Sequence, residues 1–127
     1  MYTLLDMGIV GLFFLSSELF DLVSQLQGKV PVVIDSFSIR KKPAQMLKEL
    51  CETIGLDFQP AMLNWPQGGH ADDGPWAPHW YNSVWKSTEF AAPETDLPEV
   101  PQELLSIYDQ AMIYYQKLEK YSLSGAK

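Results

Sequence analysis

The chain has 127 residues, 46% of them hydrophobic, which is enough for one folded domain with one core. Nine basic residues stand against sixteen acidic ones, and the formal net charge of −7 argues against binding to nucleic-acid phosphates or to anionic membrane surfaces. The single cysteine, Cys51, cannot form an internal disulfide, so the composition fits a reducing, cytoplasmic setting.

The first predicted element is a helix in the apolar N-terminal stretch. We expect neither a signal peptide nor a membrane span here, because basic residues are missing from its start and the unbroken apolar run, residues 7–15, is far shorter than the ~20 residues of a spanning helix. Leucines recur at three- and four-residue steps, the spacing of one helix face: Leu12, Leu15, Leu19, Leu22 and Leu26. The pattern predicts an amphipathic helix that ends near Gly28.

The next element is a predicted strand over residues 30–35. Its run from 30 to 34 is apolar and rich in β-branched residues, as in strands that are buried on both faces of a parallel sheet. Asp35 and Ser36 follow at the C-terminal end, the edge where open α/β sheets bind ligands. Pro43 then opens a helix with an apolar face, and Gly55 can end it.

Residues 68–90, GGHADDGPWAPHWYNSVWKSTEF, hold three of the four tryptophans and both histidines. Trp76, Trp80 and Val84 are spaced by four, which predicts a short helix over residues 77–87. We expect its tryptophans to be core residues first and ligand neighbours second, so that Trp80→Ala would cost roughly 3 kcal/mol by cavity formation. The histidine and aspartates of HADD match no established metal spacing, so no metal site is predicted.

A polar, proline-rich linker, residues 91–100, leads to a predicted closing helix over residues 101–121. These patterns amount to several helices and one convincing strand. One strand cannot form a sheet, because both of its edges need hydrogen-bond partners. Either a second strand is hidden in a segment with a helical pattern, or the chain is part of a larger α/β domain whose other strands lie outside it.

The order of several motifs favours the larger domain: GKVPVVIDS, KKPAQMLKELCETIGLDFQPAMLNW, DGPWAPHWYNSVWKST and YYQKL. It resembles the C-terminal half of bacterial and plant sulfotransferase-like proteins of the P-loop sulfotransferase superfamily, from about Leu4 to Leu123. The resemblance implies an α/β fold, a partial P-loop sulfotransferase-like three-layer structure that is mostly helical in this chain, with one main parallel-type strand at about 30–35. Residues 1–127 would form a single C-terminal half domain.

The resemblance also implies a reaction, the transfer of a sulfuryl group from 3′-phosphoadenosine 5′-phosphosulfate to a hydroxyl or amine. Family members usually hold this donor with a glycine-containing loop after an earlier strand and with an Arg/Ser pair, and neither occurs in this sequence. Relatives also tend to carry acidic residues where this chain has Phe37 and Ser38, and an arginine near His70. We therefore expect the chain alone to be inactive and not to bind the donor tightly.

Matching the order of motifs along this chain to that of the family, the resemblance suggests candidate site residues. Those on the cofactor side are Asp35, Ser36, His70 and Gly74, and those on the acceptor side are Trp76, His79 and Trp80. No catalytic or metal-binding residue is assigned. The expected partners are a small-molecule acceptor in the intact parent and either a second copy or a missing N-terminal half, with neither nucleic acid nor membrane among them.

Two alternatives belong to other function classes. The chain could be a non-catalytic binding or regulatory module derived from the same fold, acting through the aromatic stretch or by pairing its exposed strand. It could also be a small hydrolase built on His70, His79 and the nearby aspartates, although it lacks the G-x-S-x-G nucleophile motif.

Overall fold

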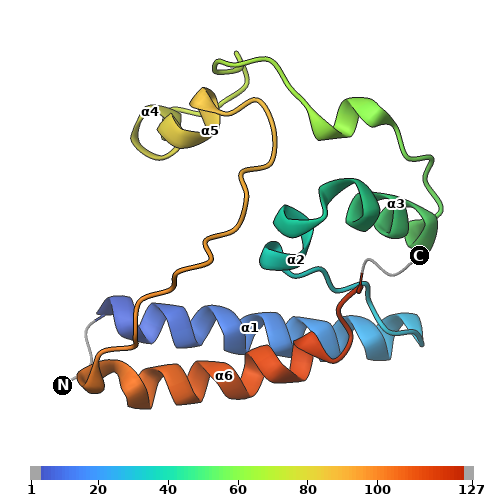
Figure 1. The fold of residues 1–127 in the computed structure, drawn as a ribbon. Helices are drawn as coiled ribbons and strands as arrows, with labels where there is room; N and C mark the ends of the chain where they lie inside the picture. The colour runs from blue at the N-terminus through green and yellow to red at the C-terminus, as the bar shows by residue number, and fades with distance from the viewer. Residues whose placement is uncertain (1–3, 125–127) are drawn as a thin grey trace. The chain divides into compact units, whose positions relative to one another are not determined.

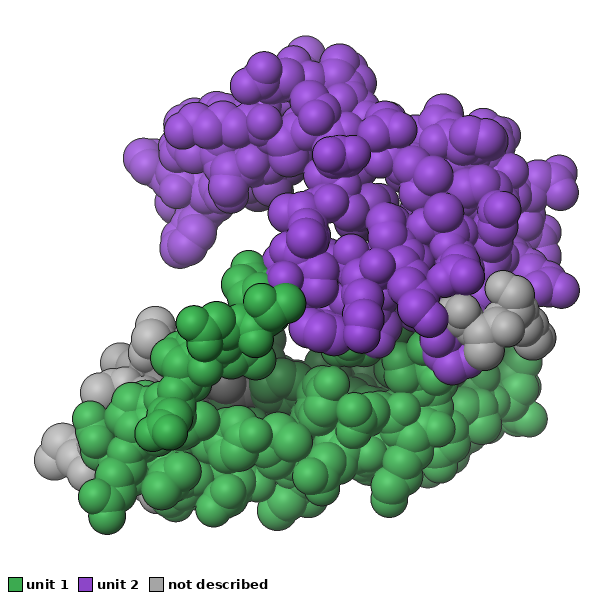
Figure 2. Space-filling model, in the orientation of Figure 1, with its two compact units in different colours: residues 1–35, 94–123 green, residues 36–93, 124–127 purple. Residues whose placement is uncertain are grey.

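The computed structural model describes residues 4–124, with side chains from residue 10 onward (Figure 1). The described residues are mainly helical. In chain order the elements are α1 (Leu4–Gln27), α2 (Ser36–Lys41), α3 (Pro43–Ile54), the 3-10 turn η1 (Pro60–Leu63), α4 (Ala77–Trp80), α5 (Asn82–Lys86), the 3-10 turn η2 (Gln102–Leu104) and α6 (Leu105–Glu119). The chain divides into two compact units, unit 1 with residues 1–35 and 94–123, and unit 2 with residues 36–93 and 124–127 (Figure 2). In the described part, no helix is both long and apolar enough to cross a membrane.

Unit 1 is built on the packing of α1 against α6, which run side by side (Figure 1). Three aromatic pairs join α1 to α6 and the residues after it, with ring centroids 4.9–6.1 Å apart: Phe13–Tyr115, Phe14–Tyr114 and Phe20–Tyr121. The Lys117 ammonium donates to the Ser17 hydroxyl at 2.9 Å and to the Asp21 carboxylate at 2.5 Å. Ser17, Ile107 and Ala111 are buried at this contact. The core of unit 1 is therefore one helix pair.

The predicted leucine face of α1 lies on the opposite side of the helix from α6. At about 100° of rotation per residue, the five leucines cluster within one stripe, while Phe13, Ser17 and Phe20 point the other way. The leucines remain 51–77% exposed: Leu12, Leu15, Leu19, Leu22 and Leu26. We call these five residues the leucine stripe. Helix α1 is thus apolar on two faces, of which α6 covers only one.

Gly28 follows α1 with a φ of 64°, the left-handed conformation that commonly ends a helix. In the segment after it, Val33 forms a single parallel bridge with Ser122, and its carbonyl accepts the Leu123 N–H at 3.0 Å. Residues 30–35 thus carry one bridge and no ladder among the described residues, so the sheet of the expected α/β fold remains a prediction.

Unit 2 begins with α2 and α3. Met46 and Cys51 of α3 are buried, and the Cys51 sulfur lies 3.9 Å from that of Met62 in η1. Gly55, with a φ of 75°, ends α3 as predicted, because its left-handed turn lets the backbone N–H reach the Glu52 carbonyl.

The predicted helix over residues 77–87 is divided into α4 and α5 at Tyr81. The side-chain amide of Asn82 donates to the Pro78 carbonyl at 3.0 Å, the acceptor that the Asn82 backbone N–H would use in a continuous helix. The side chain thereby replaces one rung of the helix, and two short helices result.

Candidate functional site

The loop before α4 is held by Asp73. One carboxylate oxygen of Asp73 accepts the His70 backbone N–H and the Trp85 indole N–H, each at 2.8 Å. Both hydrogen bonds lower the pKa of Asp73 below its ordinary value, and the bond from the His70 N–H has the larger effect. The Trp85 ring lies directly on the loop, since a Cβ on Gly69 would stand 2.9 Å from its Cε2 atom. Residues 68–74 are therefore fixed to α5 through one indole ring.

His70 and Gly74, two of the cofactor-side candidates, lie in this loop. The imidazole Nδ1 of His70 is 3.4 Å from the Asp72 carboxylate, and both side chains are largely exposed. Gly74 contributes its carbonyl, which accepts the Ala77 N–H at 3.0 Å at the start of α4. The loop therefore presents two carboxylates and one imidazole. This excess of negative charge disfavours a phosphate or sulfate group.

The acceptor-side candidates lie on or beside α4. Trp76 and Trp80 are 72% and 74% exposed, so the expectation that they are core residues is wrong. His79, also exposed, lies between them in sequence and belongs to α4. The two indoles offer uncovered aromatic surface near the loop, a common platform for flat or apolar ligands.

The tryptophans that do pack are Trp65 and Trp85, both half-buried. Trp65 donates its indole N–H to the Ser87 hydroxyl at 3.0 Å and meets the edge of Phe90, with ring centroids 5.4 Å apart. A partly buried indole needs an acceptor for its N–H, and Trp65 and Trp85 each have one, in Ser87 and Asp73. Sequence reasoning missed Asp73 and Trp65, because their hydrogen-bond partners lie 12 and 22 residues away along the chain.

Asp35 and Ser36 fall in different units. Asp35 belongs to unit 1, where it accepts a long hydrogen bond, 3.4 Å, from the Tyr115 hydroxyl. Burial, and then the charge of Asp35, raise the pKa of Tyr115 above its ordinary value. Ser36 is the exposed first residue of α2 in unit 2. Asp35 is thus tied to the helix pair of unit 1, and Ser36 starts a helix of only six residues.

Unit 2 contains five of the eight basic residues that the structure describes, and at least two of them have partners within the unit. The sole arginine of the sequence, Arg40, donates to the carbonyls of Ala91 and Ala92 at 3.1 and 2.7 Å. Lys41 lies over the Phe37 ring, 5.8 Å from its centroid. In the described part of the chain, no group of three His, Cys, Asp or Glu side chains is arranged to hold a metal ion.

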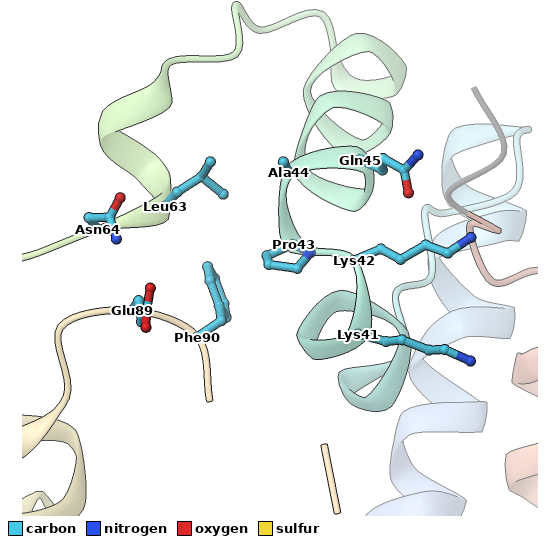
Figure 3. A pocket seen from close by; sticks show the side chains of 9 residues that line it. All are labelled: Lys41, Lys42, Pro43, Ala44, Gln45, Leu63, Asn64, Glu89 and Phe90. Carbon is cyan, nitrogen blue, oxygen red and sulfur yellow. The ribbon is translucent and has the colours of Figure 1, made fainter. Parts of the chain in front are cut away.

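Unit 2 also contains an open pocket of about 490 Å³ (Figure 3). Phe90 extends into the space between Leu63 and Pro43, and the long side chains of Lys41 and Lys42 extend away from Phe90 (Figure 3). Nine residues line the pocket: Lys41, Lys42, Pro43, Ala44, Gln45, Leu63, Asn64, Glu89 and Phe90. Its apolar wall and the Glu89 carboxylate suit a neutral or amine-bearing molecule better than an anion.

Comparison with known proteins identifies the family. The chain is 33% identical over 106 residues to branched-chain-amino-acid aminotransferase-like protein 1 of Arabidopsis thaliana, covering 82% of this chain and 19% of that protein. It is also 33% identical over 103 residues to protein 2 of the same name and organism, covering 80% of this chain and 18% of that protein. The chain thus spans about a fifth of the length of these relatives, and no solved structure matches it. Residues 13–122 match the sulfotransferase domain, and the chain belongs to that family.

Proposed function

We propose that this chain is the C-terminal, acceptor-side part of a sulfotransferase-like domain of the bacterial and plant type. The parent reaction would transfer a sulfuryl group from 3′-phosphoadenosine 5′-phosphosulfate to a hydroxyl or amine. Membership of the sulfotransferase domain family supports this reaction class, because these enzymes generally use that donor. The short share of the curated relatives that the chain spans supports its being one part of a larger assembly.

The charge of the loop at residues 68–74 does not suit the donor, and this supports the proposal that the chain alone is inactive. The candidate loop holds Asp72 and Asp73 around His70, and both carboxylates would repel a phosphosulfate. Arg40 already donates to two backbone carbonyls. Binding of the donor therefore needs the phosphate loop and the basic residues of another segment.

Calorimetric titration of the chain with 3′-phosphoadenosine 5′-phosphate, the desulfonated donor, tests this part of the proposal. We expect no binding tighter than about 1 μM, because such affinity requires several fixed anion contacts. Tight binding by the wild-type chain that is lost in an Arg40→Ala variant would show that the chain carries a donor site of its own. Lys48→Ala is the matched control, because Lys48 lies over the Phe58 ring instead.

The proposed fold is a part of the three-layer P-loop sulfotransferase-like structure. In this arrangement residues 30–35 would be one strand of the sheet, and α1 would cover it with the leucine stripe. The two apolar faces of α1 support the proposal, since a helix of this kind is stable between two layers rather than at a surface. We propose a cytoplasmic setting on the same grounds as before, the single unpaired cysteine.

For the acceptor we propose a small molecule that stacks on Trp76 and Trp80, with His79 nearby. Their exposed indoles support this role, because large aromatic surfaces left in water are uncommon without a ligand or partner. The same observation favours a second candidate function, a non-catalytic binding module that uses these tryptophans without any sulfuryl transfer.

Quenching of tryptophan fluorescence by 2-naphthol, a planar hydroxyl compound, tests the aromatic platform. We expect Trp80→Ala to weaken the binding at least tenfold, since base-like rings gain about 1–3 kcal/mol by stacking on an aromatic side chain. Leu97→Ala is the matched control, because Leu97 is 70% exposed and lies outside residues 68–90. Equal binding of 2-naphthol by Trp80→Ala and Leu97→Ala would show that the exposed indoles are not a binding platform. Transfer of sulfate to 2-naphthol by the chain joined to the rest of its domain would separate the enzyme from the binding module.

A further inference from the structure

Asp73 joins two parts of the chain that both carry candidate residues. Its Oδ2 atom accepts the His70 backbone N–H and the Trp85 indole N–H, each at 2.8 Å. Its own backbone N–H donates to the His70 carbonyl at 3.1 Å, so residues 70 and 73 are bonded in both directions. One carboxylate oxygen is therefore the junction between the loop with His70 and helix α5 with Trp85.

The bond from Trp85 to Asp73 also closes a ring of chain around α4. After Asp73, the Gly74 carbonyl accepts the Ala77 N–H at 3.0 Å, which attaches the loop to the start of α4. The Tyr81 N–H donates to the Ala77 carbonyl and the Trp85 N–H to the Tyr81 carbonyl, each at 2.8 Å. Residues 73–85 thus form one closed ring of bonded steps. The acceptor-side candidates all lie within it: Trp76, His79 and Trp80.

The base of this loop is held as well. The Gly68 N–H donates to the Trp85 carbonyl at 2.8 Å, and the Trp65 N–H donates to the Thr88 carbonyl at 2.9 Å. A loop whose ends meet and whose own side chains fill it resembles the compact surface loops that often carry function. Each of these contacts joins two residues between 65 and 88, so the shape of the loop is set by its own sequence.

We infer that Asp73 is the positioning residue of the proposed acceptor site. The inference rests on the proposed platform of Trp76 and Trp80, on which Asp73 acts through Trp85 and Gly74 rather than through contact with the acceptor. It sets the place of the two indoles relative to His70, because the loop and the ring around α4 are attached to the same carboxylate oxygen. An acceptor then meets a fixed arrangement, and its affinity is not reduced by ordering the loop.

The chemistry of Asp73 suits this role. A turn-forming aspartate needs only local backbone bonds, whereas this one also reaches the Trp85 indole, 12 residues along the chain. A carboxylate accepts hydrogen bonds that are roughly twice as strong as those between neutral groups. Both bonds use the same oxygen, so the amide oxygen of an asparagine can accept them in the same geometry, and alanine offers no acceptor.

Fluorine NMR of the full chain labelled with 5-fluorotryptophan tests the positioning without any ligand. In Asp73→Ala we expect the signals of Trp85, Trp76 and Trp80 to move. The Trp65 signal should stay, because this indole has its own partners outside the ring, and it reports that the rest of unit 2 is folded. Signals of Trp76 and Trp80 that stay at their wild-type positions would overturn the inference.

Two further variants sharpen this experiment. Asp73→Asn should leave all four signals near their wild-type positions, because the amide keeps both bonds. Trp85→Phe removes only the indole donor and should move the Trp76 and Trp80 signals as Asp73→Ala does. It decides the case if Asp73→Ala also disturbs Trp65, and unmoved Trp76 and Trp80 signals in Trp85→Phe would then reject the inference.

Fluorescence titration with 2-naphthol tests the consequence for binding. Asp73→Ala should weaken binding about tenfold, as expected for the loss of a hydrogen bond to a charged group, and Asp73→Asn should restore most of it. Asp72→Ala is the matched control, because it removes the neighbouring carboxylate, which lies 3.4 Å from the His70 imidazole, and leaves Trp85 untouched. Equal weakening by Asp72→Ala and Asp73→Ala would point to charge instead of positioning and reject the inference. No binding by the wild type would refute the acceptor platform, while the fluorine signals still decide whether Asp73 positions the indoles.

Discussion

Replacing Gly69 with alanine tests how Trp85 holds the loop of residues 68–74. A Cβ at this position would lie 2.9 Å from Cε2 and 3.0 Å from Nε1 of Trp85, whereas carbon contacts are optimal at ~3.5–4.0 Å. The ring must retreat by roughly 0.5–1 Å, and its N–H, now 2.8 Å from Asp73, retreats with it. Overpacking of a buried site costs about 1–3 kcal/mol, and because Trp85 is only half-buried we expect the lower end, about 1 kcal/mol.

Urea denaturation followed by tryptophan fluorescence measures this loss, with Gly74→Ala as the control. Nothing lies within 4 Å of a Cβ on Gly74, and both substitutions reduce the entropy of the unfolded chain equally. The difference between the two variants therefore isolates the contact with Trp85. The pKa of Asp73 should also rise toward its ordinary value of 3.8 in Gly69→Ala alone, since one of its hydrogen bonds is lost. Equal unfolding free energies and an unchanged Asp73 pKa would refute the reasoning.

Three further predictions concern the helix pair, the exposed indoles and pH. Lys117→Met should lower the unfolding free energy by about 1–3 kcal/mol in thermal denaturation, because the buried Ser17 hydroxyl loses its donor. Adding Ser17→Ala should restore much of the loss. Fully additive effects of the two substitutions would contradict this account. Trp80→Ala should change the unfolding free energy by less than about 0.5 kcal/mol, because the ring is 74% exposed; a loss near 3 kcal/mol would show that it is packed after all. The folded-state pKa of Asp73 lies below 3.8, so its stabilising effect is complete above that pH and is lost as the pH falls through the folded value. Acid titration should therefore destabilise the wild type more than Asp73→Asn, and parallel curves would count against the hydrogen bonds to Asp73.

Local periodicity predicted the helices better than it predicted their neighbours. The leucine spacing indicated α1 and its end near Gly28, and the structure has α1 end at Gln27 with Gly28 left-handed. The same spacing could not show that Phe13 and Phe20 form a second apolar face, since their partners, Tyr115 of α6 and Tyr121 just after it, lie about a hundred residues away. Which face of a two-faced helix is covered depends on partners that one sequence window does not contain.

The candidate site shows the same division between local and distant information. Spacing by four placed Trp76 and Trp80 one turn apart, but it could not decide their burial. The acceptor for the Trp85 indole, Asp73, lies 12 residues away, and that for Trp65, Ser87, lies 22 residues away. These pairings draw two indoles inward and leave the others in water, because a partly buried N–H needs a partner.

The division of unit 1 between the two ends of the chain constrains the order of folding. Helix α1 finds its partner α6 only after the intervening residues 36–93 have been made, and these form unit 2. At a synthesis rate of about 5–20 residues per second, α1 waits several seconds with both of its apolar faces in water. Most of unit 2, residues 36–93, is one continuous stretch that can form its contacts during that interval, whereas the loop closed by α1 and α6 carries an entropic cost that grows with its length. Helix α1 is thus made before its partner and stabilised only after α6 has followed, and its apolar faces are open to association in the meantime.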